Sequence, residues 1–352
     1  MSLEVIYVVR HGFRSNWLVD PKTGSNKAFV RLPTGNVADP ALSDHGIEQS
    51  RELAAFLAQA GASASANSSS SNSSSSSSSS APLLPVERVY CSPYYRCLET
   101  VQPLVETVIN RNAAKDRPVV CCEPGLVDWF GPAPFNHPQP LPAGELQKRF
   151  FPWVDPSYVA SGQAPPRAGE TMAQLHARQA AVVAHIIRQC DADGVRSVLL
   201  CTHAAPIIAL GRVLTGAVPA DVGAQDFGVF TCGVSVYHRR AQQQQQQQQQ
   251  EEQKQSLAQA RSNNNAPYPW DDRFHTLACA HWTHGRGVSG GWDCTVNCDC
   301  TFLSGGEERG WRFSADDESA AALERQKSGI VDSGLELGVV VTGTSRVSKV
   351  AA

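Results

Sequence analysis

Two histidines and three arginines in this chain follow stretches that have the composition of buried strands. "VIYVVRHGFR" ends with Arg10, His11 and Arg14, and "VYCSPYYRC" carries Arg96 just after a second such stretch. "VLLCTH" ends with His203, directly before the apolar segment "AAPIIALGRVL". An imidazole is a nucleophile for phosphorus, and guanidinium groups bind phosphate oxygens through paired hydrogen bonds. These residue types predict transfer of a phosphoryl group through a covalent phosphohistidine on His11.

The same chemistry needs an acid that protonates the departing alkoxide. Asp128, in "GLVDW", follows a third strand-like stretch and is the carboxylate expected at the same place. An aspartate beside a tryptophan can instead cap a loop. Glu170 is the alternative acid, although "GET" before a helical pattern is more typical of capping. We therefore favour Asp128 and keep Glu170 as the alternative.

A cysteine-rich segment near residue 300 raises the question of a metal site. "CTVNCDC" holds Cys294, Cys298 and Cys300, with His281 and His284 upstream. The segment has no C-x-x-C pair of the kind that binds zinc. Residues two apart in a strand share a face, which explains Cys298 and Cys300 as packing residues. We expect no metal and no cofactor.

Strand-like and helix-like patterns alternate along most of the chain. Apolar, β-branched runs predict strands near residues 3–9, 86–92, 118–126, 196–206 and 228–240. Helical spacing predicts helices near residues 42–61, 94–109, 170–190 and 206–216, the first of them ending at Gly61. This alternation predicts an α/β fold, a three-layer α/β/α sandwich with a mostly parallel central sheet. Ligands of such sheets bind beyond the carboxyl ends of the strands, where the histidines and arginines fall.

The chain reads as one domain over residues 1–313 with two polar insertions and a weakly patterned tail over 314–352. A serine run, Ser68–Ser80, and a glutamine run, Gln242–Gln250, cannot pack a core, so we expect disordered insertions near residues 63–81 and 241–265. Residues 129–167 are rich in proline and aromatics and predict a fixed cap over the site. These aromatics either bind a flat leaving group or pack the cap on the body.

Charge, hydropathy and cysteine content limit which binding partners and which cellular compartment we expect. The net charge of -3 gives no basic field, so we expect no direct binding to nucleic acid. No run is long and apolar enough to span a bilayer, which predicts a protein without a membrane partner. The 11 cysteines have no regular spacing and suit a reducing compartment, either cytoplasmic or nuclear.

Five sequence blocks in order carry a resemblance to a known family. "RHG", "LSDHGIEQSRELAAFL", "CSPYYRCLET", "GET" and "CTHAAP" resemble the histidine phosphatase superfamily, which has the phosphoglycerate mutase-like fold. The resemblance implies that His11 is the nucleophile and that Arg10, Arg96 and His203 bind phosphate. Arg14 matches the second arginine of the R-H-G-x-R branch, and Asp128 falls where close relatives carry glutamate. The pattern that follows "RHG" in the mutases is absent, so the resemblance implies a phosphatase rather than a mutase.

Other segments resemble a narrower group within that superfamily. "RHGFRSNWL", "SPYYRCLETVQPL", "PAGELQKRFFP" and "CDCTFLSGGEERGWRF" are similar to the phosphatase-like head of the tau subunit of fungal transcription factor IIIC and to its stand-alone relatives. The chain ends about forty residues after Phe313, so we expect the tau subunit's further assembly domain to be missing.

Two functions from different classes are therefore expected. The first is a phosphomonoesterase that acts on a phosphorylated small molecule or phosphoprotein. The alternative is a catalytically weak interaction module with a transcription-complex partner, related to RNA polymerase III transcription.

Overall fold

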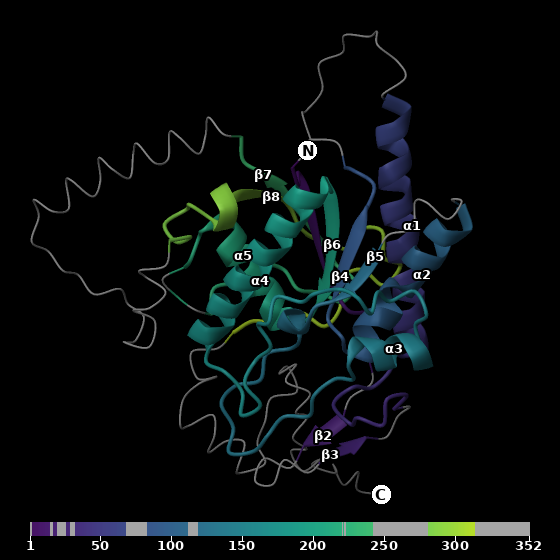
Figure 1. Cartoon of the computed structure of the whole chain (residues 1–352), viewed down its shortest axis with the longest axis vertical. Coiled ribbons are helices and arrows are strands. Elements are labelled where there is room, and N and C mark those ends of the chain that lie inside the picture. The colour runs from purple at the N-terminus through teal and green to yellow at the C-terminus, as the bar shows by residue number, and fades with distance from the viewer. Residues whose placement is uncertain are drawn as a thin grey trace, which may run out of the picture.

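A six-stranded sheet forms the centre of the molecule (Figure 1). The computed structural model describes residues 2–14, 17–19, 26–28, 32–67, 83–111, 119–219, 221, 223–241 and 281–313. The strand order is β5-β4-β6-β1-β7-β8. The strands of the sheet are β1 (Val5–Arg10), β4 (Arg88–Cys91), β5 (Val119–Cys122), β6 (Ser197–Thr202), β7 (Val234–Arg239) and β8 (Trp292–Asp299).

The sheet is mostly parallel, as the sequence predicts. β5, β4, β6 and β1 pair in parallel, whereas β7 runs antiparallel to β1 and β8 antiparallel to β7. The four parallel strands therefore end at one edge, and the segments that carry the predicted site residues leave the sheet there.

Two pairs of helices cover the two faces of the sheet (Figure 1). The pair α1 (Asp44–Asn67) and α2 (Tyr95–Arg111) lies on one face, and the pair α4 (Met172–Asp193) and α5 (Ala204–Thr215) lies on the other. The predicted three-layer α/β/α sandwich is confirmed.

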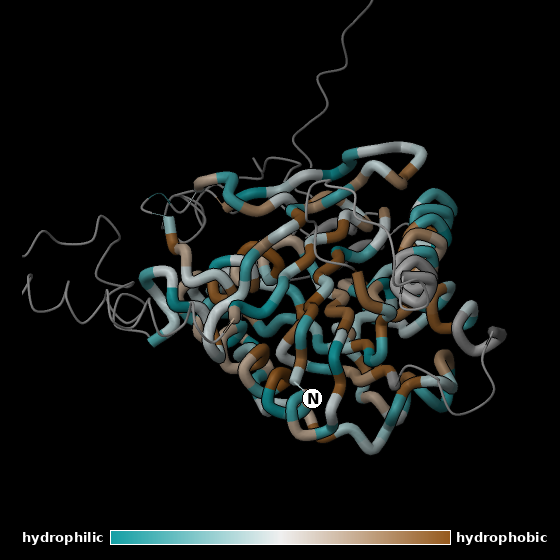
Figure 2. The backbone as a smooth tube through the Cα atoms, turned by 90° about the horizontal axis from the view of Figure 1, so that it is seen from above, coloured by the Kyte–Doolittle hydropathy of each residue, from teal (hydrophilic) through white to brown (hydrophobic). Residues whose placement is uncertain are grey.

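Alternation along β1 explains why both faces need a helical layer. Ile6 and Val8 belong to the core under α4 and α5, whereas Val5, Tyr7 and Val9 belong to the core under α1 and α2. Successive strand residues point to opposite faces, so a strand apolar at every position must be buried on both sides. The hydrophobic residues accordingly concentrate in the interior of the backbone trace (Figure 2).

Local signals set the ends of α4, but one predicted helix end is wrong. Thr171 caps α4 through a capping box with Gln174, and Gly194 ends the helix in the left-handed conformation with φ 72°. The helix predicted to stop at Gly61 continues to Asn67. A single glycine costs a helix only about 1 kcal/mol, and the neighbouring alanines favour helix.

Several short elements have no clear signal in the sequence. β2 (Trp17–Val19) and β3 (Asn26–Ala28) form a separate antiparallel pair, and the cap contains the helix α3 (Ala143–Arg149). Two 3-10 turns, η1 (Pro124–Leu126) and η3 (Val288–Gly290), follow β5 and precede β8, respectively. Both runs of the predicted insertions and the tail from residue 314 lie outside the described residues.

None of the helices among these described ranges is long and apolar enough to cross a membrane.

The position of the serine run predicts that its length matters little. It connects the end of α1 to the start of β4, at the amino end of the parallel strands and opposite the predicted site. Loop entropy changes by only about 0.6 kcal/mol for each doubling of loop length. We expect that deleting residues 68–80 changes the free energy of unfolding in urea by about 1 kcal/mol or less. A larger destabilisation would mean that this segment packs on the body.

Candidate phosphate site

The strand register brings the two predicted histidines together at the carboxyl edge of the sheet. β1 and β6 are neighbours, and Arg10 is paired with Thr202, so His11 and His203 each follow directly. The amide of His11 extends the pairing by donating to the Thr202 carbonyl at 3.0 Å. The two imidazole rings lie edge to face with centroids 5.2 Å apart.

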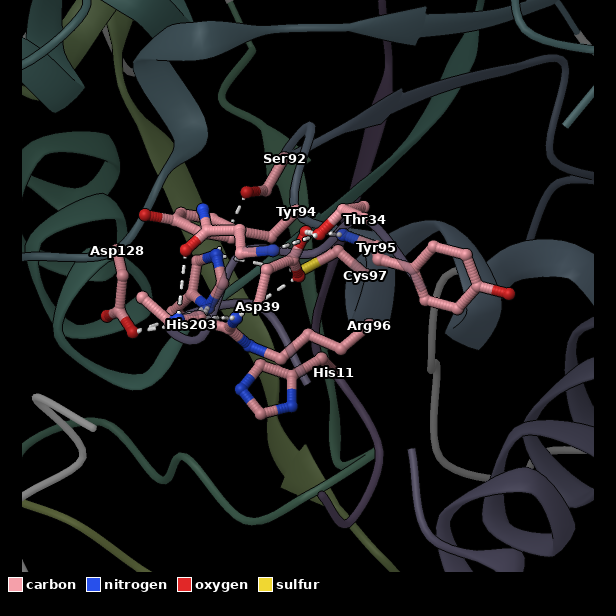
Figure 3. Close-up of polar contacts among 12 residues, drawn as sticks. His11, Thr34, Asp39, Ser92, Tyr94, Tyr95, Arg96, Cys97, Asp128 and His203 are labelled. Carbon is pink, nitrogen blue, oxygen red and sulfur yellow. Dashed lines mark hydrogen bonds and ion pairs between the residues drawn. The ribbon is translucent and has the colours of Figure 1, made fainter. Parts of the chain in front are cut away.

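Arg96 is the residue that joins the separate segments of the site (Figure 3). It lies in the first turn of α2, and its Nη2 is 3.2 Å from Nδ1 of His203 and 3.3 Å from Oδ2 of Asp128. Asp128 reaches this point from the segment that follows η1. The structure therefore brings Arg96, Asp128, His11 and His203 to one place, as expected from the strand ends.

The remaining two predicted arginines lie on the β1 side of the same site. Arg10 is fully buried, and its Nη1 donates to the carbonyls of Val229 and Arg309. Arg14 is also buried and forms an isolated bridge with Leu42. Both arginines lie near enough to His203 for their charges to lower its pKa.

The main chain around His11 determines which ring nitrogen can react. Nδ1 of His11 lies 2.8 Å from the Gly12 carbonyl oxygen, which can only accept, so Nδ1 carries the proton and Nε2 keeps its basic lone pair. A side chain at Gly12 would come within 2.8 Å of the Gly46 carbonyl in the first turn of α1. The glycine after the histidine therefore lets α1 approach the loop that carries the nucleophile.

His203 is held as a neutral imidazole. Burial lowers its pKa well below the usual range, and the charges of Arg96, Arg14 and Arg10 lower it further. Because Arg96 can only donate, Nδ1 of His203 accepts, and Nε2 donates to the Ser92 hydroxyl at 2.9 Å. His203 is also the N-cap residue of α5. An arriving anion would offset the cationic charges and favour its protonation.

Asp39 is a site residue that the sequence analysis missed. Its Oδ2 accepts from the Tyr95 amide at 3.0 Å, and its Oδ1 lies 3.6 Å from Nη1 of Arg96. Burial raises the pKa of Asp39 to about 6, although the Arg96 charge opposes this rise. Arg96 thus lies between two buried carboxyl groups. Asp39 stands in a loop without periodicity, "GNVADPAL", and only its contacts show its place.

Glu170, the alternative acid, is held away from this arrangement. Both of its carboxylate oxygens accept from Nε of Arg178 at 3.0 Å, and Arg178 also donates to the carbonyl of Gly125 at 2.6 Å. The pair therefore joins α4 to η1. Its neighbour Thr171 caps the helix, which agrees with the capping interpretation of "GET".

The aromatic residues of the cap pack against the body and against one another. Phe151 lies 4.9 Å from the Tyr95 ring, and Phe130 stacks on His137 at 4.3 Å. The buried carboxylate of Glu123, also missed from the sequence, accepts from the Tyr158 hydroxyl at 2.8 Å and ties the cap to β5. These contacts favour the packing interpretation over an aromatic wall for the leaving group.

The cysteine segment shows no metal-binding arrangement within the described residues. No three His, Cys, Asp or Glu side chains among them gather closely enough to hold a metal ion. A side chain at Gly233 would come within 2.4 Å of the Cys298 sulfur and 3.0 Å of the Cys300 sulfur. The two sulfurs thus lie on one side of their segment. Regular strand alternation, the predicted reason, does not apply, because Cys298 has φ 57° and Cys300 follows the end of β8.

Two proteins are similar in sequence to this chain, one over most of it and the other over a smaller part. The Transcription factor tau 55 kDa subunit of Saccharomyces cerevisiae is 28% identical over 341 residues, which cover 93% of this chain and 62% of that protein. The Ecdysteroid-phosphate phosphatase of Drosophila melanogaster is 29% identical over 137 residues, 38% of this chain and 17% of that protein. The chain thus spans less than two thirds of the length of either relative.

Solved structures also match over much of the chain. The ecdysone phosphate phosphatase from Bombix mori has a TM-score of 0.49 at 19% identity and covers 67% of this chain and 89% of its own. The mycobacterial glucosyl-3-phosphoglycerate phosphatase has a TM-score of 0.38 at 16% identity and covers 68% of this chain and 92% of its own.

A family model gives the assignment that agrees with the geometry. The model described as the Histidine phosphatase superfamily (branch 1) matches residues 79–252, which include Arg96, Asp128 and His203. The described fold and the pairing of His11 with His203 across β1 and β6 agree with this match. Over residues 79–252 the chain matches the histidine phosphatase superfamily (branch 1), which confirms the recognition made from the sequence.

Proposed function

We propose that this chain hydrolyses phosphate monoesters through a phosphohistidine on His11. One observation carries the proposal: side chains from four separate strand ends, all less than a tenth exposed, converge at the carboxyl edge of the sheet. Buried cations act on a phosphoryl group in a low-dielectric site, where they stabilise developing charge more strongly than in water. The substrate class is a phosphorylated small molecule or phosphoprotein.

The first step transfers the phosphoryl group to the protein. The lone pair of His11 Nε2 forms the N–P bond while the P–O bond to the leaving group breaks. Arg10, Arg14 and Arg96 bind the phosphoryl oxygens, and His203 adds a hydrogen bond. Asp128 donates its proton to the departing oxygen.

The second step returns the protein to its starting state. Asp128, now a carboxylate, takes a proton from a water molecule, whose oxygen forms the new P–O bond as the N–P bond breaks. Inorganic phosphate leaves, Asp128 regains its proton, and His11 regains its lone pair. Our prediction is that no metal ion takes part.

A second candidate function is an interaction module of a transcription complex, located in the nucleus. The observation that favours it is the similarity to the yeast tau subunit over 93% of this chain. This similarity supports the module more directly than it supports hydrolysis, because it extends further along the chain than the similarity to the Drosophila phosphatase. Affinity capture of the full chain from nuclear extract tests it, with RNA polymerase III factors as the expected partners and their absence as the contrary result.

Substitution of the nucleophile tests the hydrolase. We expect wild-type protein to turn over p-nitrophenyl phosphate between mildly acidic and neutral pH, and His11→Ala to lose at least about a thousandfold in kcat. Equal rates for the two proteins, or no turnover by either, would overturn the proposal. Circular dichroism of His11→Ala controls for folding.

The proposed acid role of Asp128 predicts that the effect of its substitution depends on the leaving group of the substrate. Asp128→Asn removes the proton donor, so we expect about a hundredfold loss in kcat with an alkyl phosphate but less than about tenfold with p-nitrophenyl phosphate. Nitrophenolate leaves without a proton, which explains the difference. An equal loss with both esters would contradict the acid role. Glu170→Gln, at the alternative acid, should show no such selectivity.

The protonation of the pocket predicts how pH affects anion binding. The pKa of His203 is lowered by burial and by its cationic neighbours, and that of Asp39 is raised to about 6. A bound dianion favours the protonated form of both groups, so binding is coupled to proton uptake. We expect tungstate affinity, measured by calorimetry, to rise as pH falls from about 8 to 6, by at most about tenfold per pH unit for each proton taken up.

His203→Gln provides the control for that measurement, because an amide does not titrate in this range. Its pH dependence should be weaker than that of wild type, while Asp39→Asn should retain the share that comes from His203. An affinity independent of pH, or an unchanged slope in His203→Gln, would contradict this assignment of the coupled proton.

A further inference from the structure

The segment after β8 contacts the candidate site although it lies about 300 residues from His11 in the sequence. It is the last described part of the chain (yellow in Figure 1). The carbonyl of Arg309 accepts a hydrogen bond from Nη1 of Arg10, together with the carbonyl of Val229. Two main-chain acceptors on one guanidinium nitrogen restrict the orientation of the whole planar group.

Glu308, the residue before this carbonyl, is tied to two other elements of the site edge. Its Oε2 accepts from Nε2 of Gln49 at 2.7 Å and lies 2.5 Å from Nε2 of His45, both on α1. Its carbonyl accepts from the amide of Thr231 at 3.1 Å, in the loop that also carries Val229. One glutamate thus connects α1 with both segments whose carbonyls hold Arg10.

Gln49 extends the same connection to the nucleophile loop. Its Oε1 accepts from the amide of Phe13 at 2.9 Å, while its Nε2 donates to Glu308. The Arg309 guanidinium lies 4.3 Å above the Phe13 ring. Arg309 itself has φ 56°, a conformation that costs a non-glycine residue about 1–2 kcal/mol. The surrounding contacts hold the residue in this conformation, in which its carbonyl reaches Arg10.

We propose that Glu308 is a positioning residue for the phosphate pocket. Its carboxylate holds residues 308–309 on α1, next to the main-chain hydrogen bond between Thr231 and residue 308, and so sets the two carbonyls that orient Arg10. The inference rests on the proposed function, since it concerns the same pocket. An arginine already oriented by its neighbours loses less side-chain freedom when it binds an anion.

The rest of the segment has its own anchors, so the role of Glu308 is local. Phe313 is buried 5.4 Å from the Trp129 ring and 6.1 Å from His176, and Trp311 lies 6.3 Å from Trp129. Substitution of Glu308 therefore leaves these contacts in place. We expect a folded protein whose defect is confined to the pocket.

Tungstate binding to the full chain, measured by calorimetry without turnover, tests the proposal. We expect Glu308→Ala to weaken binding about tenfold, the size of one charged hydrogen bond. The matched control is Glu307→Ala, which removes the same charge from an exposed neighbour. Loss of a negative charge alone strengthens anion binding, so the control should bind as well as wild type or better. Glu308→Ala binding as tightly as wild type would overturn the proposal.

A double-mutant cycle tests whether Glu308 acts through Arg10. We expect Arg10→Met to weaken tungstate binding, and Glu308→Ala to change the affinity less than about twofold in that background. Full additivity of the two losses would contradict the proposal. Glu308→Gln retains an oxygen for Gln49 and guards against misfolding. Its loss should be smaller than that of Glu308→Ala and should also vanish with Arg10→Met, and a loss that persists there would contradict the proposal.

The proposed hydrolase activity and the proposed role of Glu308 are refuted by different results. Wild type that binds tungstate with the expected cycle but does not hydrolyse p-nitrophenyl phosphate refutes the hydrolase and supports the role of Glu308. Wild type that hydrolyses the ester but shows no effect of Glu308→Ala refutes only the positioning role. Wild type that does not bind tungstate refutes both.

Discussion

The burial of guanidinium groups at one edge of the sheet is the constraint on which the site depends. Arg10 and Arg96 are fully buried, and moving such a charge out of water costs several kcal/mol unless it is paired and hydrogen-bonded. Arg96 is compensated by Asp39, by Asp128 and by the carbonyl of Ala38 at 3.1 Å. Arg10 is compensated differently, by main-chain carbonyls that come from two distant segments.

This difference divides the pocket into two halves with different chemistry. On the Arg96 side, the carboxyl groups of Asp39 and Asp128 already contact the guanidinium, so an arriving phosphoryl dianion must displace them or favour their protonated forms. On the Arg10 side, the main-chain carbonyls of Val229 and Arg309 accept hydrogen bonds from Nη1 and orient the guanidinium. The Arg10 guanidinium is therefore oriented before an anion arrives, provided that the supporting loops hold the group still. The hydrogen bonds that join α1, the loop at Thr231 and the segment at Glu308 meet that requirement.

The parts of this arrangement that follow strands could be predicted from the sequence. Arg10, His11, Arg96 and His203 each stand just beyond an apolar run, and parallel strands end at one edge, so their convergence follows from the alternation of elements. The fold class follows from the same pattern. The predicted end of α1, at Gly61, was wrong because glycine is a weak stop signal when alanines surround it.

Site residues that lie in loops are not preceded by an apolar run and were not predicted from the sequence. Asp39 and Glu308 carry neither periodicity nor a cap pattern, and only long-range contacts place them against Arg96 and Gln49. The pair of Glu170 with Arg178 is a similar case, because a glutamate before a helix has the same local sequence whether its carboxylate enters the pocket or turns to α4. Side-chain direction at such positions depends on tertiary packing.

The energetics of the pocket bear on the two candidate functions. A module that only needs this fold gains no stability from buried arginines, since apolar residues of similar volume usually replace a buried ion pair at no loss. Here the cations come with Asp39, Asp128 and a set of oriented carbonyls, all of which such a replacement would make unnecessary. The presence of the whole set together suits a pocket that binds an anion. Docking through the outer surface places no demand on residues that are fully buried, so this argument concerns the pocket and leaves a transcription-complex role of the outer surface open to its own test.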